Sequence, residues 1–429
     1  MRILLYVLLI LPIARGAQAQ CSRDPNDTYN QGGSGTGGLA LTNMALLSAP
    51  LNSYPAGFSD PQAATNANYA NDLNFSEALM SVVQRQATTF PIGSSLGGFS
   101  YTFDPQLGLP VRRTQSFGPM FADRPQSGGL HKFSVELAAQ RTNWRALGGV
   151  DLRSGLVNIR TYPASVTSSG DPEAEYATTR ITFQMDRAVM GLNYGLTSRI
   201  DIGVLLTALQ ATVDGTEHYM RTDLTTGQVL VVDGRHECGT SAGGGRIAIR
   251  GKFEFLSRPA LDLAVGVEVR LPSIVAADQL TAGAAQTKMM LIGSLPRGSF
   301  SPHFNVGATY MAGYTPGILA HTVQAPNIKN GSEIDYTVGA DVAVSNSLTL
   351  NGDVIGRSLL RSYNFIQTVE PLAAQITMKP GTVNLLLGAL GGKILIGHAL
   401  LLNMSVAFPL NSAGLKPGLT PVIGLERAF

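Results

Sequence analysis

The sequence has few charged residues, and beyond its N-terminal segment it has no long apolar run. Only 14% of the 429 residues are charged and the formal net charge is +2, which excludes a basic surface for nucleic acid and an acidic tail. No later stretch reaches the roughly 18 apolar residues of a membrane-spanning helix. The 48 glycines and the 44% hydrophobic content indicate instead a β-rich protein of many short elements.

The N-terminus is predicted to be a secretory signal peptide, residues 1–19. Arg2 supplies a positive charge, residues 3–13 are nearly all apolar, and Ala17-Gln18-Ala19 forms a small-x-small cleavage site. The apolar run is too short to span a membrane as a helix. A secreted chain without spanning helices can still be integral to a membrane, but only as a closed barrel.

The chain has two cysteines, Cys21 and Cys238. In an oxidising compartment an even pair favours one disulfide, here closing a very long loop. The alternative is two unpaired thiols at opposite ends of the molecule, because the sequence does not show that they approach within bonding distance.

Residues 20–129 have little strand periodicity and are predicted to form an N-terminal plug or hatch segment. One short helix is expected over residues 75–88, where Asn74 can cap the helix and Glu77 stands at the reciprocal capping position. We expect this section to lie inside the mouth of the barrel or on its periplasmic side. For residues 20–70 the alternative is a partly disordered tail.

From residue 130 onward, apolar and polar residues alternate with the period of β-strands. The connections between strands are alternately tight and long, the asymmetry of outer-membrane barrels with short periplasmic turns and long outer loops. An all-β, antiparallel transmembrane β-barrel of about twelve strands is therefore predicted for residues 130–429, and an added hairpin from residues 97–117 would give fourteen. The predicted strands are 130–145, 177–196, 200–215, 244–257, 260–273, 286–296, 300–314, 333–345, 347–361, 381–395, 398–410 and 418–429.

Two features of this pattern carry specific expectations. The longest connections, which include residues 146–176, 216–243 and 362–380, are predicted to be loops. In addition, the apolar residues stand at odd positions up to Met185 but at even positions from Ala188 onward. Because side chains alternate between the two faces of a strand, this reversal predicts a bulge or an extra turn between them.

The hairpin over residues 246–271 has one apolar face and one charged face. In a soluble sandwich the apolar face would be inside, whereas in an outer-membrane barrel it faces lipid. The last strand favours the barrel, because its alternation ends on Phe429 at the C-terminus. This ending resembles the terminal signature by which outer-membrane barrels are recognised, so we expect the barrel-insertion machinery to bind this strand.

The same alternation directs charged side chains into the lumen. We expect Arg250 and Lys252 to face the region of Asp262 and Glu268 on the neighbouring strand and to form an ion-pair ladder. Such charges either only solvate the lumen and hold the barrel shape, or form a constriction that sets selectivity. The candidate lumen residues are Arg246, Arg250, Lys252, Glu254, Asp262, Glu268, Arg270, Asp341, Asp353 and Arg357.

No catalytic residue, metal site or cofactor is predicted, and the protein is not expected to be an enzyme. His236 and Cys238 lie near His218, but their spacing matches no zinc pattern. His303 is expected to be a structural polar residue of the barrel interior.

Four segments carry a family resemblance: residues 90–125, 193–204 (NYGLTSRIDIGV), 300–310 (FSPHFNVGATY) and 419–429 (LTPVIGLERAF). They resemble the outer-membrane transporter family first associated with phenol meta-cleavage pathways, which is distantly similar to the long-chain fatty-acid outer-membrane channels. The resemblance implies a barrel in the outer membrane of a Gram-negative-type bacterium, in contact with lipid. It implies passive uptake of a small hydrophobic or aromatic permeant, with the N-terminal segment as hatch. The alternatives are a non-conducting barrel that displays long loops and, third, an outer-membrane enzyme.

Overall fold

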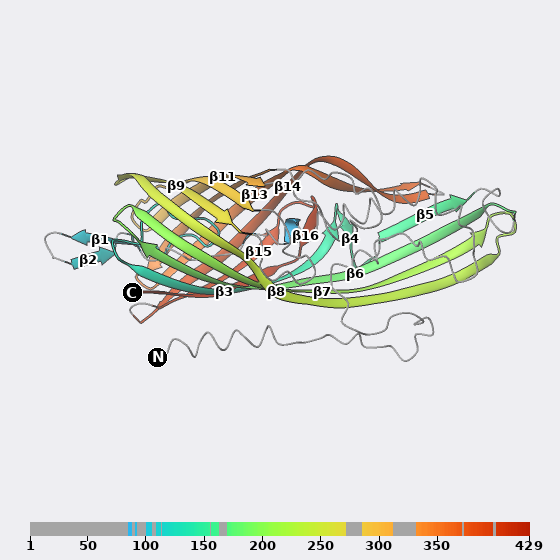
Figure 1. Ribbon diagram of the computed structural model, residues 1–429, viewed down its shortest axis with the longest axis horizontal. Coiled ribbons are helices and arrows are strands. Elements are labelled where there is room, and N and C mark those ends of the chain that lie inside the picture. The colour runs from blue at the N-terminus through green and yellow to red at the C-terminus, as the bar shows by residue number, and fades with distance from the viewer. Residues whose placement is uncertain are drawn as a thin grey trace.

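The computed structural model describes residues 85–87, 91, 100–104, 109–112, 114–154, 156–162, 170–271, 285–311, 332–370, 373–397 and 400–429. Twelve antiparallel strands form a closed barrel, because the last strand pairs with the first and the first also pairs with the second (Figure 1). These strands are β3 (Phe133–Leu147), β6 (Glu173–Gly195), β7 (Ile200–Asp223), β8 (Val229–Arg258), β9 (Leu261–Arg270), β10 (Gln286–Ser294), β11 (Phe300–Met311), β12 (Glu333–Ser345), β13 (Leu348–Glu370), β14 (Ala373–Ile396), β15 (Leu400–Pro409) and β17 (Thr420–Ala428).

The prediction of twelve strands is confirmed, and the alternative of fourteen is wrong. The hairpin of β1 (Tyr101–Asp104) and β2 (Leu109–Arg112) forms a separate two-stranded sheet and does not join the barrel. It lies at the same end of the barrel as the C-terminus (Figure 1). Within the described residues, no helix is long and apolar enough to cross a membrane.

Several strands continue far beyond the barrel as a set of long hairpins, visible at the right of Figure 1. Residues 216–243 and 362–380, expected as loops, lie mostly in β7, β8, β13 and β14, so the expectation of long loops there is wrong. The expected loop 146–176 contains β4 (Val150–Asp151) and β5 (Leu156–Tyr162), and β5 pairs with β6. Outside the membrane a strand needs no apolar face toward lipid, so it does not need the apolar alternation of the membrane-spanning part. The end of the alternation in the sequence is therefore not the end of the strand.

The tight turns lie at one end of the barrel and the long hairpins at the other. Short turns are periplasmic in outer-membrane barrels, so the hairpins, which we call the extension, are extracellular. Large apolar side chains such as Phe253, Val265 and Val306 are exposed on the outer surface of the barrel. A closed barrel with an apolar exterior is the architecture of the Gram-negative outer membrane, and the protein resides there.

The predicted bulge or extra turn near Asp186–Arg187 is wrong. The β6–β7 register runs without a shift from Glu173 to Gly195, and odd positions of β6 face inward along the whole strand. Met185 is buried in the interior of the extension, and Arg187 is buried in the lumen. The strand is therefore regular. At this level its environment changes: in the extension the interior is apolar and the outside is water, whereas below it the lumen is polar and the outside is lipid.

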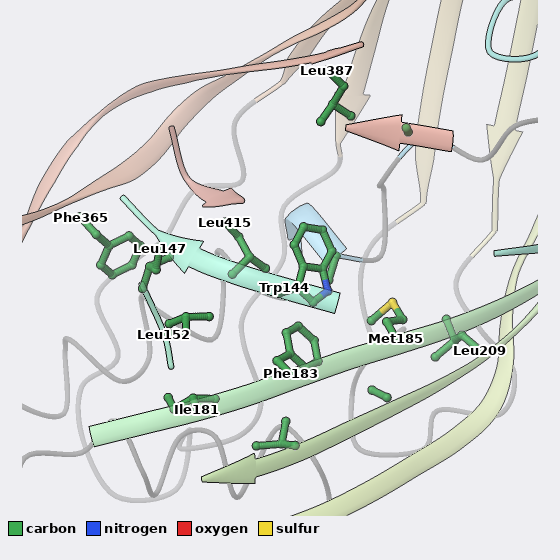
Figure 2. Close-up of a cluster of buried hydrophobic side chains, with 14 of the residues drawn as sticks. Trp144, Leu147, Leu152, Ile181, Phe183, Met185, Leu209, Phe365, Leu387 and Leu415 are labelled. Carbon is green, nitrogen blue, oxygen red and sulfur yellow. The ribbon is translucent and has the colours of Figure 1, made fainter. Parts of the chain in front are cut away.

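An apolar cluster fills the interior of the extension (Figure 2). Trp144 of β3 and Phe183 of β6 stack with ring centroids 6.1 Å apart and an interplanar angle of 17°. Leu415, from β16 (Leu415–Pro417), joins them because β16 pairs with the outer end of β3. The extension therefore has a core like that of a soluble β-protein, built on the barrel strands.

Candidate functional site

Residues 114–129, which we call the lumen segment, lie within the barrel near its periplasmic end. Two inward-facing lysines bind its backbone carbonyls. Lys393 Nζ donates to the oxygens of Phe117 (3.2 Å) and Pro119 (2.6 Å). Lys252 Nζ donates to the oxygens of Arg124 (2.9 Å) and Gln126 (2.7 Å). Charged donors from opposite walls therefore satisfy carbonyls of a segment that has no strand partner of its own.

Carboxylates of the barrel wall bind the donors of the same segment. Asp201 accepts from Ser127 Oγ (2.5 Å) and from the amide of Gly128 (3.2 Å). Asp262 accepts from Gln126 Nε2 (2.7 Å), and Glu254 accepts from the Ser127 amide at 3.3 Å. Hydrogen bonds to charged groups are stronger than neutral ones, so the segment has a defined position in the lumen.

His303 links three strands to the lumen segment. Its Nδ1 lies 3.1 Å from Asp341 Oδ1 and its Nε2 lies 2.6 Å from Asp353 Oδ1. Asp353 Oδ2 in turn accepts from the amide of Phe121 at 3.3 Å. The His303 side chain is only 1% exposed, so it acts as a structural connection and touches no solvent.

The ten candidate lumen residues all lie on the inner face of the barrel, buried or half-buried. The ion pairs differ in part from the expected ladder. Arg250 pairs with Glu268 (2.9 Å), but Lys252 pairs with Asp201 (3.1 Å) and not with Asp262. The register explains the difference, because Asp201 stands directly opposite Lys252 whereas Asp262 stands opposite Ser257.

The sequence patterns missed three residues of this site. Asp123, which pairs with Arg250 at 2.5 Å, lies in a segment without periodicity. Glu333, which pairs with Arg357 at 2.6 Å, stands at the start of a strand. Lys393 is a single cation in an apolar run. The sequence indicates its inward direction only by its odd position, which it has in common with the inward-facing Val383 and Ala389 of the same strand.

A cavity of about 210 Å³ lies in the lumen above the lumen segment. Met120 to Asp123 form its floor and Pro91 is on its opposite side. One wall is apolar, formed by Val189, Leu205, Leu209 and Ala248, which belong to β6, β7 and β8. The charged residues of the lining come mainly from β8 to β13 and from Asp123.

Residues 85–87 and Pro91, which we call the cap, close the extracellular end of the lumen. The guanidinium of Arg85 donates to the carbonyls of Leu360 and Ser332, each at 3.0 Å. Gln86 Oε1 accepts from the amide of Leu415 at 2.6 Å, and Gln140 Nε2 donates to the Pro91 oxygen at 3.3 Å. The cavity therefore lies between two parts of the N-terminal region, both anchored to the barrel wall.

Some predictions fall on residues that the structure does not describe. Only Arg85–Ala87 of the expected helix over residues 75–88 are described, and they are helical. Cys238 lies on β8 opposite Asp214, whereas Cys21 lies outside the described residues, so their disulfide stays a prediction. Among the described side chains, no group of three or more His, Cys, Asp or Glu residues could hold a metal ion.

No family model and no curated protein matches the chain. Among solved structures, it is similar to an outer-membrane channel of Pseudomonas putida F1, with 10% identity and a TM-score of 0.47, covering 71% of this chain and 98% of that one. The P. putida toluene transporter TodX has 10% identity and a TM-score of 0.32, covering 72% and 93%. The outer-membrane protease OmpT of Escherichia coli has 8% identity and a TM-score of 0.23, covering 70% and 97%. At these identities the likeness is one of fold alone.

Proposed function

We propose that the protein is an outer-membrane channel for passive uptake of small hydrophobic or aromatic molecules. The cavity of about 210 Å³ between the lumen segment and the cap carries this proposal. Protein interiors are normally packed with few voids larger than a water molecule. A barrel whose only role was to hold the extension outside the cell would have no need of such a void in its lumen.

In this proposal residues 20–129 act as a plug or hatch for the barrel of residues 130–429. The lumen segment is held by polar contacts to side chains of the wall and is not a strand of the barrel sheet. Such contacts can be exchanged for water one at a time without breaking strand pairing. The mixed charges of the lumen, including Arg250, Glu268 and Arg357, would set selectivity around the permeant.

The test is uptake into proteoliposomes together with single-channel conductance. We would compare the intact chain with a variant in which residues 115–128 are replaced by a Gly-Ser linker. The channel proposal predicts toluene uptake by both proteins, with a larger conductance for the linker variant because its lumen is open. Empty liposomes are the control, and absence of flux with both proteins would contradict the proposal.

The second candidate is a non-conducting barrel that displays the extension as a binding surface. One observation favours it: Tyr176, Met220 and Val232 are exposed and lie in register across β6, β7 and β8. An apolar row outside the membrane is typical of an interaction surface. No catalytic role is proposed, because His303, the buried histidine in the described part of the lumen, is occupied by two carboxylates.

We also propose that the barrel-insertion machinery recognises the C-terminal strand. Phe429 exchanges two backbone hydrogen bonds with Phe133 of β3, at 2.8 and 3.3 Å, and so stands at the seam that closes the barrel. Its ring is exposed on the outer surface. Replacing Phe429 by Ser is expected to lower the amount of protein assembled in the outer membrane, measured by heat-modifiable gel mobility.

A further inference from the structure

The N-terminal region enters the lumen from the extracellular side. The cap, which begins at Arg85, closes the extracellular end of the lumen, whereas β1 and β2 lie at the same end of the barrel as the C-terminus (Figure 1). The lumen segment follows them in the chain and lies near that periplasmic end. From the cap to β2 the chain therefore passes from the outer end of the barrel to the inner end, and the residues before Arg85 approach the cap from the extracellular end.

The part of the lumen that the structure describes has no room for the residues before Arg85. If the signal peptide ends at residue 19, as the sequence predicts, 84 − 20 + 1 = 65 residues precede the cap. The cavity between the cap and the lumen segment measures about 210 Å³, and a cavity of about 150 Å³ in another protein holds a single benzene molecule. The interior of the extension is filled by its own apolar cluster. These residues therefore need a place outside the barrel.

The outer face of the extension has large apolar side chains at its far end. Tyr176, Met220 and Val232 stand in register across β6, β7 and β8, and Val232 is 57% exposed. Water and not lipid surrounds this part of the molecule, so a continuous apolar surface there is typical of a docking site. The turn between β7 and β8 adds further exposed residues: Leu224, Val229 and Leu230.

Cys238 lies on the same face of the extension as this apolar row. It stands opposite the exposed Asp214 of β7, and the register has no shift between Cys238 and Val232. The two residues are 238 − 232 = 6 positions apart, an even number, so they share a face and lie about 20 Å apart along β8. Cys238 is not a free thiol, and Cys21 is the one other cysteine of the sequence.

The residues that follow Cys21 include an apolar stretch that could cover the row. Residues 39–51 (LALTNMALLSAPL) contain no charge, and nine of them are Ala, Leu or Met. The stretch begins 39 − 21 = 18 residues after Cys21, and an extended chain of that length reaches about 60 Å. A row about 20 Å from Cys238 is within that reach. Packing the two apolar surfaces together removes both from water.

We propose that residues 20–84 lie outside the cell and cover the outer face of the extension, tethered there by a disulfide between Cys21 and Cys238. In this arrangement residues 39–51 pack on the row of Tyr176, Met220 and Val232. The inference goes beyond the proposed channel and does not depend on flux. Within the N-terminal section, residues 85–129 are the part inside the barrel, and residues 20–84 are its extracellular anchor.

The tether forms in the periplasm, which the chain crosses before it is inserted. Each thiol loses its hydrogen as the S–S bond forms. The two electrons and two protons pass to the disulfide of a periplasmic thiol oxidoreductase, which becomes a dithiol. Such proteins keep this compartment oxidising, so the reaction has its oxidant.

The first experiment locates residues 20–84 in intact cells. The recognition site of a sequence-specific protease is inserted after Ala64 of the full-length protein and, as the matched control, after Gly298 in a tight periplasmic turn. Protease added to the medium is expected to cut the Ala64 variant in intact cells, and the Gly298 variant only after the outer membrane is permeabilised. Resistance of the Ala64 variant in intact cells would overturn the proposal.

The same cut tests the disulfide. On a denaturing gel without reductant, the fragment that ends at the inserted site is expected to stay attached to the barrel, and dithiothreitol is expected to release it. Cys21→Ser should release the fragment without reductant, whereas the neighbouring Ser22→Ala should not. If the fragment with both cysteines intact is released without reductant, Cys21 and Cys238 are not bonded and the tether is wrong.

The third experiment identifies what covers the apolar row. A photoreactive benzophenone side chain is placed at Met220 of the Ala64 variant and, as the control, at Val338 on the lipid face of β12. After irradiation of intact cells, cutting and full reduction, the N-terminal fragment is expected to remain attached only in the Met220 case. Cross-links from this position to a second copy of the chain or to another protein would contradict the proposal.

Discussion

The lower and upper halves of the same strands are inverted with respect to each other. In the membrane, β3, β6 and β7 direct mainly apolar side chains outward, and their inward side chains are mixed, with Glu136 and Asp201 as well as Val189. In the extension, apolar residues such as Phe183 and Val213 face inward. The change occurs at one level, where Arg141, Asp186 and Gln210 lie in register on the outer face. Alternation therefore shows that a strand has two faces, and only the surroundings decide which face is which.

This level marks the extracellular boundary of the membrane. From Asp186 to the end of β6 at Gly195 there are 195 − 186 + 1 = 10 residues. A tilted strand needs about 9–11 residues to cross the hydrocarbon layer. The length of the lower half thus agrees with the boundary that the side chains indicate, and the comparison can be tested by substitutions on either side of it.

The largest expected effect is the loss of an apolar side chain inside the extension. Phe183→Ala should lower the free energy of unfolding by about 3–5 kcal/mol, because Phe183 is fully buried against Trp144 and its loss leaves a cavity. Phe253→Ala, on the lipid face of β8, should cost less because lipid chains fill the space. Urea-induced unfolding from lipid vesicles measures both, and an equal cost would contradict the inversion.

The next largest effect is expected from a new charge on the outer face of β6, placed either within the membrane or in the extension. Met190→Arg, outward-facing midway through the membrane, should destabilise the protein by about 2–4 kcal/mol. Thr182→Arg, outward-facing in the extension, should change stability by less than about 0.5 kcal/mol because water solvates it. The same unfolding measurement applies. A cost at residue 182 similar to that at 190 would place the boundary elsewhere.

A smaller effect is expected from making the interior of the lower half apolar. Lys393→Met removes the donor to the carbonyls of Phe117 and Pro119 and should cost about 1–3 kcal/mol. It should also increase the frequency of open events in single-channel recordings, because the lumen segment loses an anchor. Lys379→Met, exposed on the extension of the same strand, serves as the control. Recordings identical to wild type would argue against the lumen segment as hatch.

The smallest effect concerns the boundary itself. Arg141 and Asp186 form an ion pair at 2.6 Å, but the Arg141 side chain is 60% exposed. Exposed pairs contribute about 0.2–1 kcal/mol, and salt screens them. A double-mutant cycle with Arg141→Ala and Asp186→Ala should give a coupling energy in this range that falls at 1 M salt. A coupling that does not change with salt would mean that the pair is shielded from water.

Most of the barrel could be predicted from the sequence, because lipid imposes a strict requirement on the outer face of every strand. The alternation around Val265 and the turn at Ser257-Arg258 are direct consequences of that requirement. The extension could not be predicted in the same way, since residues 233–243 carry charged and small side chains without apolar alternation, although they pair with β7 throughout. The reversal at Met185–Ala188 was visible in the sequence, but its cause was not.

The lumen was predictable in outline only. Parity placed Arg250, Glu268 and Asp353 on the inner face, because alternation assigns faces residue by residue. Which charges form pairs depends on the register between strands, however, and the register is fixed by turns whose length the sequence shows only approximately. For this reason Asp262 was expected as the partner of Lys252, which in the structure pairs with Asp201. The position of Asp123 depends on a path through the barrel that has no periodicity and so leaves no pattern to read.

The path of the N-terminal region has a consequence for assembly. The cap lies at the extracellular end of the lumen and the lumen segment near the periplasmic end, and both precede β3 in the chain. β3 is also the strand on which the ring closes, by pairing with β17. When β17 closes the ring, we therefore expect it to enclose a segment of the same chain that already lies along the lumen. On this expectation the barrel is completed around its contents and does not pass through an empty pore.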